Sequence, residues 1–379
     1  MRAQSVRTWW SRERPSISRR DLRSQSSEVR ALVAAVDLED PQSPLEPELE
    51  EFTALARAAG ARIVGEIVQR RARVDPATLF GKGKVHEIAQ AATSLGADTL
   101  LVLNDLRPRQ RINLENVVPL RIVDRTMLIL DVFARHARSR EGKLQVELAQ
   151  LRYRQANLIG VGTSLSRLGG GIGTRGPGET KLETDRRQIG RRISTLRRAL
   201  ENVRVQRANR RDAVREDGEP LVALVGYTNA GKSSLLNRLS GEASAFVADQ
   251  PFATLDPMVR RVWLGDRQTI RLADTVGFIT ELPDELLSAF RGTLEELQGA
   301  ALLVHVIDGS NPGWERQKKS VDATLEELGL GERPVLLVFN KSDRGSYDVP
   351  ADALRVSTVS GSGIAQLRSA IASAVSVPR

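Results

Sequence analysis

The sequence GYTNAGKS at residues 226–233 could bind the phosphates of a nucleotide. It matches the phosphate-binding pattern G-x-x-x-x-G-K-[ST] at every fixed position. Its glycines allow a tight turn in which successive backbone N–H groups point at phosphate oxygens. We expect Lys232 to reach the β- and γ-phosphates and Ser233 to bind Mg²⁺. The residues expected to contact the nucleotide here are Gly226, Tyr227, Thr228, Asn229, Ala230, Gly231, Lys232, Ser233 and Ser234.

Two predicted elements would hold this loop in place. The apolar run at 221–225 predicts a buried strand, and residues 234–239 predict the first turns of a helix. The positive end of that helix dipole would face the phosphates. The alternative, an ordinary glycine-rich turn, is disfavoured because strand, loop and helix follow in the required order.

A second motif, formed by Asn340, Lys341 and Asp343, could read the base. It follows a strand predicted at 335–339, as the Asn-Lys-x-Asp element does in GTPases. The Asp343 carboxylate can accept from guanine N1–H and the exocyclic amine, whereas adenine has no such pair of donors on that edge. Lys341 can lay its alkyl stem along the base. The alternative is a polar turn, which a spacing of about 110 residues from the phosphate loop disfavours.

The base site has a second predicted side. Ser357 and Thr358 follow a strand predicted at 354–356 and are similar to the Ser-Ala element that backs guanine in the same fold. We therefore expect both residues to contact the nucleotide.

Two segments between these motifs could complete the phosphate site. Residues 272–277, LADTVG, have the Asp-x-x-Gly form at the end of a strand. Asp274 should hold Mg²⁺ through water, and the N–H of Gly277 should meet the γ-phosphate, with Thr275 and Val276 between them. Upstream, Thr254 could supply a second hydroxyl to Mg²⁺; the alternative is an ordinary loop threonine. The residues expected to act in catalysis are Lys232, Thr254 and Gly277.

The composition limits the kind of protein this can be. The chain has 379 residues, enough for two or three domains, and a net charge of +9, which indicates a polyanionic partner. It has no cysteine, which excludes disulfides and thiolate metal sites and favours a reducing compartment. No apolar run reaches the length of a membrane span. An aromatic content of 4% argues against base stacking as the main mode of RNA contact.

The first 30 residues are predicted to be a disordered basic tail. They hold eight arginines, many serines and only three acidic residues. An organelle transit peptide is the alternative, although such peptides are poor in acidic residues.

Residues 31–140 predict a small α/β subdomain. Strands are expected at 31–36, 63–68 and 99–103, and helices at 50–58, 83–94, 109–115 and 127–134. Because strands alternate with helices, we expect a parallel sheet. The sequence FGKGK at 80–84 could bind an anion at a helix start; the alternative is a loop and cap with two exposed lysines.

Residues 141–217 predict a helical hairpin. Helices are expected at 143–158 and 184–214 around a glycine-rich loop at 169–178. The expected apolar faces are Leu144, Leu148 and Leu151 on the first helix, and Ile189, Ile193, Leu196 and Leu200 on the second. Residues 151–217 hold 16 Lys and Arg against 7 Asp and Glu, so we expect the basic partner surface here. A solvated coiled-coil linker is the alternative.

The segment 169–187, GGGIGTRGPGETKLETDRR, together with the nucleotide motifs, closely resembles the HflX family of ribosome-associated GTPases. Further resemblance is carried by FGKGK at 80–84, DRT at 124–126 with LILD at 128–131, and EGKLQVEL at 141–148. The resemblance covers roughly residues 30–375.

The resemblance implies an α/β fold class in four parts. A Ras-like P-loop GTPase domain at 218–379 would follow the tail at 1–30, the α/β subdomain at 31–140 and the basic hairpin at 141–217. It implies GTP and GDP as ligands and Mg²⁺ as cofactor. A helix expected at 364–375 would be the last of the chain, whereas many bacterial members carry a further small C-terminal domain.

The resemblance also implies a partner. Family members bind the large (50S) ribosomal subunit and its rRNA, with the hairpin and glycine-rich loop near the peptidyl-transferase region, and some split stalled or stressed ribosomes. We therefore expect a monomeric, cytoplasmic, ribosome-stimulated GTPase that splits or remodels ribosomes. The alternative is a GTP-gated RNA-binding assembly factor without splitting activity. A membrane-recruited signalling GTPase is disfavoured because no lipidation motif is present.

One position bears on how hydrolysis is activated. Ras-like enzymes place a glutamine after the Asp-x-x-Gly motif to orient the attacking water. Here that residue is Phe278, so we expect slow hydrolysis without a partner. In several GTPases that lack this glutamine, an asparagine at the position of Asn229 helps to hold K⁺; the alternative is a turn residue.

Overall fold

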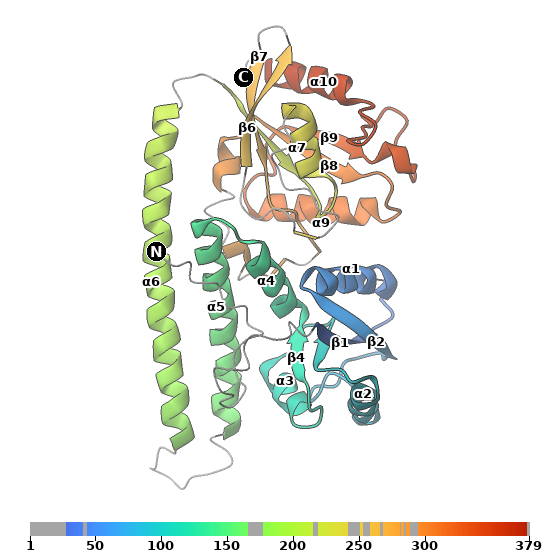
Figure 1. Ribbon diagram of the computed structural model, residues 1–379, viewed down its shortest axis with the longest axis vertical. Coiled ribbons are helices and arrows are strands. Elements are labelled where there is room, and N and C mark those ends of the chain that lie inside the picture. The colour runs from blue at the N-terminus through green and yellow to red at the C-terminus, as the bar shows by residue number, and fades with distance from the viewer. Residues whose placement is uncertain are drawn as a thin grey trace. The chain divides into compact units, whose positions relative to one another are not determined.

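The computed structural model describes residues 28–40, 44–165, 177–214, 219–241, 251–252, 258–265, 268–280, 282–283, 286–288 and 295–376 (Figure 1). Residues 1–27 of the basic tail, Thr254 and most of the glycine-rich loop lie outside these residues. The predicted end of the disordered tail was wrong, because Val29 and Arg30 already belong to the first strand. The chain divides into two compact units. The first comprises Met1–Arg135 with Gln150–Ser194, and the second comprises His136–Ala149 with Thr195–Arg379.

The first unit is built on a four-stranded sheet of order β2-β1-β3-β4 in which every pairing is parallel, as predicted. Its strands are β1 (Val29–Asp37), β2 (Ala61–Arg70), β3 (Thr99–Val102) and β4 (Arg121–Asp124). Its helices are α1 (Leu45–Ala58), α2 (Lys82–Leu95), α3 (Pro108–Glu115) and α4 (Arg125–His136). Strand β4 was not predicted, because its sequence RIVD has only two apolar residues and no alternation.

Strand β1 explains why this sheet needs helices on both faces. All residues from Ala31 to Val36 are buried, which is typical of a central parallel strand. Alternate side chains such as Leu32 and Ala34 pack in one cluster with Val85 and Ile88 of α2. Helix α1 lies against β1 and β2 and buries Phe52.

The predicted hairpin is present as two long helices, α5 (Arg140–Leu165) and α6 (Pro177–Val214), which run in opposite directions (Figure 1). On α6 the predicted apolar face is confirmed for Ile189, Ile193 and Leu196, which are buried, whereas Leu200 is half-buried. On α5 the prediction was partly wrong. Leu148 is buried, but Leu144 and Leu151 are only half-buried, while Val146 and Ala149 are more deeply buried. Two sides of α5 are therefore covered, which a single stripe cannot describe.

The second unit contains a five-stranded sheet of order β6-β7-β5-β8-β9. Its strands are β5 (Leu221–Val225), β6 (Met258–Gly265), β7 (Gln268–Asp274), β8 (Leu302–Asp308) and β9 (Val335–Asn340). Only β6 and β7 pair antiparallel, at one edge. Its helices are α7 (Lys232–Ser240), α9 (Trp314–Glu327) and α10 (Ile364–Ser376), with short 3-10 helices η3 (Glu295–Gly299) and η4 (Ser342–Arg344).

Helices cover both faces of this sheet, as expected for a Ras-like α/β fold. Leu236 of α7 and Leu367 of α10 share a buried cluster with Leu224 of β5. On the other face Trp314 of α9 packs edge-on against Phe339 of β9, with ring centroids 5.1 Å apart. No helix in the described part of the chain is both long enough and apolar enough to cross a bilayer.

The prediction of a strand at 354–356 was wrong. Only Arg355 pairs, in an isolated parallel bridge with Phe339. The ladder stops there because β9 ends at Asn340 and the chain turns at Lys341, whose φ is 63°.

Candidate nucleotide-binding site

The phosphate loop joins β5 to α7, and its two fixed glycines are required by its geometry. Gly226 has a φ of 146°, and a Cβ atom there would lie 2.2 Å from the carbonyl oxygen of Val306. Gly231 has a φ of 95°, and a Cβ atom there would lie 2.2 Å from Nδ2 of Asn340. The loop therefore packs directly against β8 and the end of β9, and only glycine fits at either position.

Lys232 lies inside this loop at the start of α7. Its side chain is buried, and Nζ donates to the carbonyl oxygens of Gly226 at 3.0 Å and Tyr227 at 2.8 Å. Burial lowers the pKa of Lys232 to about 8, although the charge of Asp274 partly opposes the shift. Phosphate oxygens bound beside this ammonium group would raise its pKa again and favour its charged form.

Ser233 and Asp274, the residues predicted to bind Mg²⁺, lie in contact. The Ser233 hydroxyl donates to Oδ2 of Asp274 at 2.5 Å. Asp274 is fully buried at the end of β7, and the register that pairs it with Leu224 brings it beside the loop. Thr275 fixes the chain after it by donating from its hydroxyl to the carbonyl oxygen of Leu224 at 2.7 Å.

These residues fit the way in which proteins commonly hold Mg²⁺. The described residues contain no group of three or more His, Cys, Asp or Glu side chains that could hold a metal. Mg²⁺ is commonly held by one or two protein oxygens, with phosphates and waters completing its shell. One hydroxyl and one carboxylate match that donor set.

The Asp-x-x-Gly segment lies against the phosphate loop. A Cβ atom on Gly277 would lie 2.8 Å from Cα of Thr228 and 3.1 Å from Nζ of Lys232. The backbone N–H of Phe278 donates to the carbonyl oxygen of Gly226 at 3.1 Å, and Thr228 N–H donates to that of Phe278 at 2.6 Å. The ring of Phe278 is buried, so it cannot take the water-orienting role of the usual glutamine.

The residues predicted to contact the base also lie close together. Asn340 is buried and donates through Nδ2 to the carbonyl oxygen of Ala230 at 2.9 Å, while its Oδ1 accepts from the N–H of Thr358 at 3.3 Å. Asp343 accepts from the Ser357 hydroxyl at 2.5 Å, and this bond lowers the pKa of the Asp343 carboxyl. Asn340 therefore fastens the phosphate loop to the segment that carries Ser357 and Thr358.

Asp308 belongs to this site and was missed by sequence reasoning. Its Oδ2 accepts from Nζ of Lys341 at 2.7 Å, and its Oδ1 accepts from the N–H and hydroxyl of Ser310. This ion pair holds the Lys341 side chain that was predicted to lie along the base. The available signal was position, because Asp308 ends the apolar run of β8 and pairs with Asn340.

Two further predictions have mixed support. Asn229 has a left-handed φ of 59°, which is typical of a turn asparagine, and its role toward K⁺ stays a prediction.

At the FGKGK sequence, α2 begins at Lys82 with Gly81 as its N-cap. Lys82 is exposed, but Lys84 is half-buried and its ammonium contacts Glu87 at 2.7 Å. Anion binding there stays a prediction.

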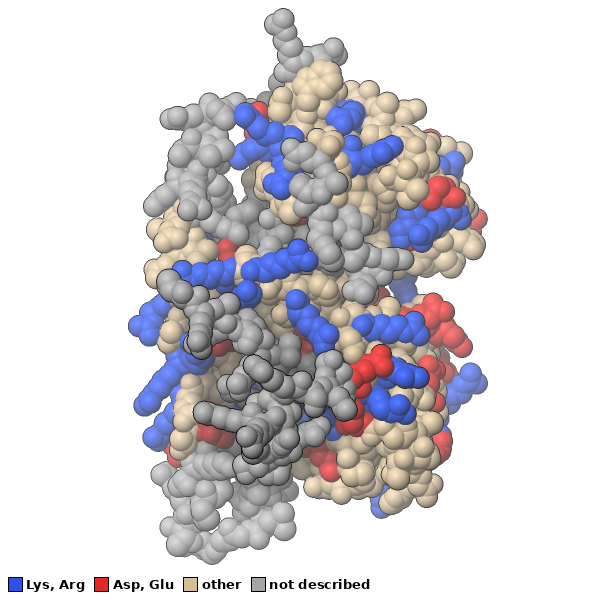
Figure 2. Space-filling view, in the orientation of Figure 1, with Lys and Arg blue, Asp and Glu red and all other residues tan. Residues whose placement is uncertain are grey.

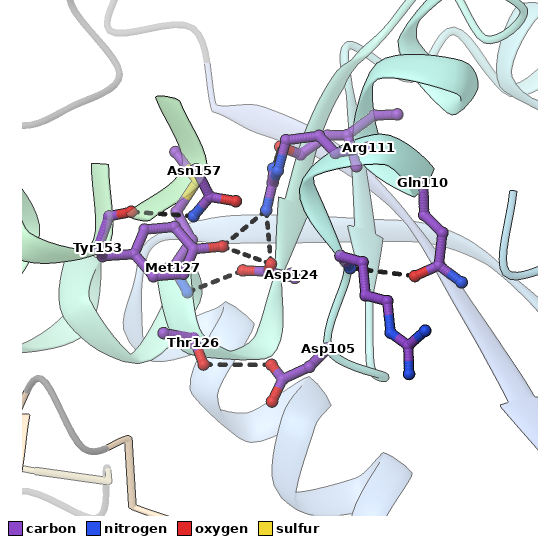
Figure 3. Close-up of polar contacts among 10 residues, drawn as sticks. Asp105, Gln110, Arg111, Asp124, Thr126, Met127, Tyr153 and Asn157 are labelled. Carbon is purple, nitrogen blue, oxygen red and sulfur yellow. Dashed lines mark hydrogen bonds and ion pairs between the residues drawn. The ribbon is translucent and has the colours of Figure 1, made fainter. Parts of the chain in front are cut away.

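A second polar cluster lies in the first unit, around the end of β4 (Figure 3). Buried Asp124 accepts at Oδ2 from Nη2 of Arg111 and the hydroxyl of Tyr153, both at 2.5 Å. Its Oδ1 accepts from the N–H of Met127 at 3.0 Å. Burial and the negative charge of Asp124 raise the pKa of the Tyr153 phenol. These groups satisfy one another, so we assign the cluster the structural role of fastening α5 to the sheet.

Comparison with protein families agrees with this geometry. Three family models match consecutive parts of the chain: "GTP-binding GTPase N-terminal" at residues 46–134, "GTP-binding GTPase Middle Region" at 136–213 and "50S ribosome-binding GTPase" at 221–341.

Individual proteins are similar over most of the chain. GTPase HflX of Lacrimispora saccharolytica is 46% identical over 346 residues, which cover 90% of this chain and 81% of that protein. GTPase HflX of Escherichia coli is 48% identical over 296 residues, which cover 78% and 69%. The crystal structure of a GTP-binding protein from Sulfolobus solfataricus in complex with GDP aligns at 23% identity with a TM-score of 0.46, covering 92% of this chain and 98% of that one. By its sequence similarity to the two HflX proteins, this chain belongs to the HflX family of GTPases, and it hydrolyses GTP.

Proposed function

We propose that this GTPase binds the large ribosomal subunit in its GTP-bound form and splits or remodels stalled or stressed ribosomes. The ribosome in turn stimulates hydrolysis. The observation that supports this proposal is that one chain of the HflX family holds both a GTPase domain and a long helix with an exposed arginine face. We further propose that the protein acts as a monomer on cytoplasmic ribosomes.

The arginine face lies on α6. In Figure 2, blue side chains follow the part of the molecule where Figure 1 draws this helix. Over residues 183–206 the exposed arginines are Arg186, Arg187, Arg191, Arg192, Arg197, Arg198 and Arg204. The same stretch has three acidic residues. Such a row of guanidinium groups can contact RNA phosphates, and each contact makes binding more sensitive to salt.

At the nucleotide site we assign the following roles. Lys232 contacts the β- and γ-phosphates, Ser233 and Asp274 hold Mg²⁺ together with Thr254, and Gly277 donates its N–H to the γ-phosphate. Mg²⁺ would neutralise charge on the phosphates when bound. Asp343 reads guanine, with Lys341, Ser357 and Thr358 around the base. Phosphoryl transfer needs mainly such positioning and electrostatic stabilisation, which these groups can supply.

Light scattering of intact ribosomes tests the proposal. A mixture with this protein and a nonhydrolysable GTP analogue should lose scattering as subunits separate, and the GDP-bound protein should cause a smaller loss. Binding to free large subunits without any loss of scattering would favour the assembly-factor alternative. Failure to bind either particle at low salt would contradict both functions.

A charge-matched pair of variants tests the arginine face. Replacing Arg186, Arg187, Arg191 and Arg192 by Gln should weaken subunit binding and reduce its salt dependence, while the intrinsic GTPase rate is unchanged. The control replaces four exposed arginines of α1, β2 and the loop after β2, namely Arg57, Arg62, Arg70 and Arg73, by Gln. Equal losses in both variants would mean that only net charge matters and that α6 is not the contact surface.

A further inference from the structure

The hydroxyl of Tyr227 reaches from the phosphate loop to the segment that follows the Asp-x-x-Gly motif. It accepts from the backbone N–H of Thr280 at 2.9 Å and lies 2.9 Å from the Thr280 hydroxyl. Tyr227 is buried, so these contacts lie away from bulk water. The interaction joins residues 53 positions apart in the sequence.

Backbone contacts hold the same segment from the other side. Tyr227 and Phe278 form an isolated parallel bridge, made by the two hydrogen bonds that link Phe278 to Gly226 and Thr228. The carbonyl oxygen of Ile279 also accepts from the Ser320 hydroxyl of α9 at 3.3 Å. Residues 278–280 are therefore fixed by the phosphate loop and by α9.

We propose that Tyr227 is a positioning residue for GTP hydrolysis. By holding Thr280, its hydroxyl keeps residues 277–280 where the N–H of Gly277 can donate to the γ-phosphate. This inference rests on the γ-phosphate role proposed above for Gly277. Because Gly277, Phe278 and Ile279 have no polar side chain, these three residues can act on the phosphate only through their backbone. A backbone donor stabilises developing charge only when its position is fixed in advance.

The proposal predicts different effects on the binding of GTP and of GDP, because GDP has no γ-phosphate for Gly277 to contact. Tyr227→Phe removes the hydroxyl and keeps the ring. We expect it to lower the single-turnover hydrolysis rate about tenfold, as loss of a buried hydrogen bond can do. The affinity for a nonhydrolysable GTP analogue should fall by a similar factor, while GDP affinity stays the same.

Two matched variants sharpen the test. Thr280→Val removes one of the two contacts and keeps the N–H, so its effect should have the same direction and be smaller. The double variant should be no worse than Tyr227→Phe, since Tyr227→Phe already removes the contact that Thr280→Val removes. Tyr347→Phe, at a tyrosine of the same unit that is 54% exposed, is the control and should leave rate and affinities unchanged.

Gly277→Ala distinguishes the role proposed for Tyr227 from the γ-phosphate role proposed for Gly277. The added Cβ would collide with Thr228, so preference for the GTP analogue over GDP should disappear. If Gly277→Ala has this effect while Tyr227→Phe and Thr280→Val leave rate and preference unchanged, the role of Tyr227 is overturned. If Gly277→Ala also has no effect, the γ-phosphate assignment fails too. Equal loss of GTP-analogue and GDP affinity in Tyr227→Phe would indicate a general structural role and overturn the proposal.

Discussion

The Ser233 hydroxyl donates to the Asp274 carboxylate across 2.5 Å, although the two residues lie on different elements and 41 positions apart. The pairing of β5 with β7 brings Asp274 to the phosphate loop, and the helix that starts at Lys232 turns Ser233 toward it. The hydroxyl and the carboxylate that we propose as Mg²⁺-binding groups therefore lie in direct contact.

Asp274→Asn should separate metal use from nucleotide binding. The amide keeps the size of the side chain but removes the charge that attracts Mg²⁺, so we expect the hydrolysis rate to fall about a hundredfold. GDP affinity measured in EDTA should change little, whereas the gain in affinity on adding Mg²⁺ should shrink. An unchanged magnesium dependence of hydrolysis would contradict the role of Asp274.

Asp343→Asn should change the base preference. The amide replaces one acceptor by a donor that can complement the additional carbonyl of xanthine, so affinity should fall for GDP and rise for the xanthine nucleotide. Asp348→Asn, at an exposed aspartate of the same unit, is the control. Calorimetry with both nucleotides measures the change, and unchanged GDP affinity would contradict the role of Asp343 in binding the base.

The pKa of Lys232 predicts how nucleotide binding depends on pH. In the free protein burial lowers this pKa to about 8, so the side chain begins to lose its proton at slightly alkaline pH. Phosphates beside Nζ favour the charged form and raise the pKa. Binding should therefore take up a proton above pH 8, and affinity should fall as the pH rises through this range.

Calorimetry in buffers with different ionisation enthalpies measures that proton directly. Near pH 6.5 the uptake at Lys232 should disappear, since the ammonium group is already charged in the free protein. Equal proton uptake at pH 6.5 and pH 9 would show that Lys232 is not the group responsible.

That most residues of the candidate nucleotide site lie together could be predicted, because they belong to short motifs. The loop at 226–233 and the Asn340 motif each lie next to a strand that is apolar enough to recognise. The structure adds contacts that join distant parts of the sequence, such as Asp308 with Lys341 and Tyr227 with Thr280. Strand register and loop packing decide these pairings, and periodicity along one segment carries no information on them.

The first unit shows the same limit. Its parallel sheet followed from alternating strands and helices, yet β4 has four residues and only two of them are apolar. Its place at the sheet edge is fixed by pairing with β3 and by Asp124, whose partners Arg111 and Tyr153 lie on α3 and α5. Tertiary contacts determine this strand more than its own sequence does.

Tyr153→Phe should loosen the attachment of α5 to that sheet (Figure 3). It removes one of three donors to the Asp124 carboxylate, which is buried, and the lost bond should cost about 1–3 kcal/mol. Hydrogen exchange should become faster at the amide of Met127, which donates to the same carboxylate, and along α5. Exchange in β5 and α7 should not change. Unchanged protection of Met127 would mean that Arg111 alone holds the carboxylate.

The last prediction concerns how hydrolysis is stimulated. The ring of Phe278 is buried and cannot orient water, so basal turnover should be about 10⁻⁴–10⁻³ s⁻¹, the range of unassisted Ras-like enzymes. If Asn229 helps to seat K⁺ beside the phosphates, replacing Na⁺ by K⁺ should raise the basal rate, because a cation there stabilises developing charge. Large subunits should raise the rate further.

Asn229→Gly tests this with little change to the backbone, because glycine readily adopts the left-handed φ of 59° found there. The variant should lose the difference between K⁺ and Na⁺ and keep part of the stimulation by large subunits. Deleting residues 169–178 should do the reverse, since that change leaves the nucleotide site intact. Equal rates of the wild type in K⁺ and Na⁺ would refute the potassium role. Absence of stimulation by ribosomes at every salt concentration would refute activation by the ribosome.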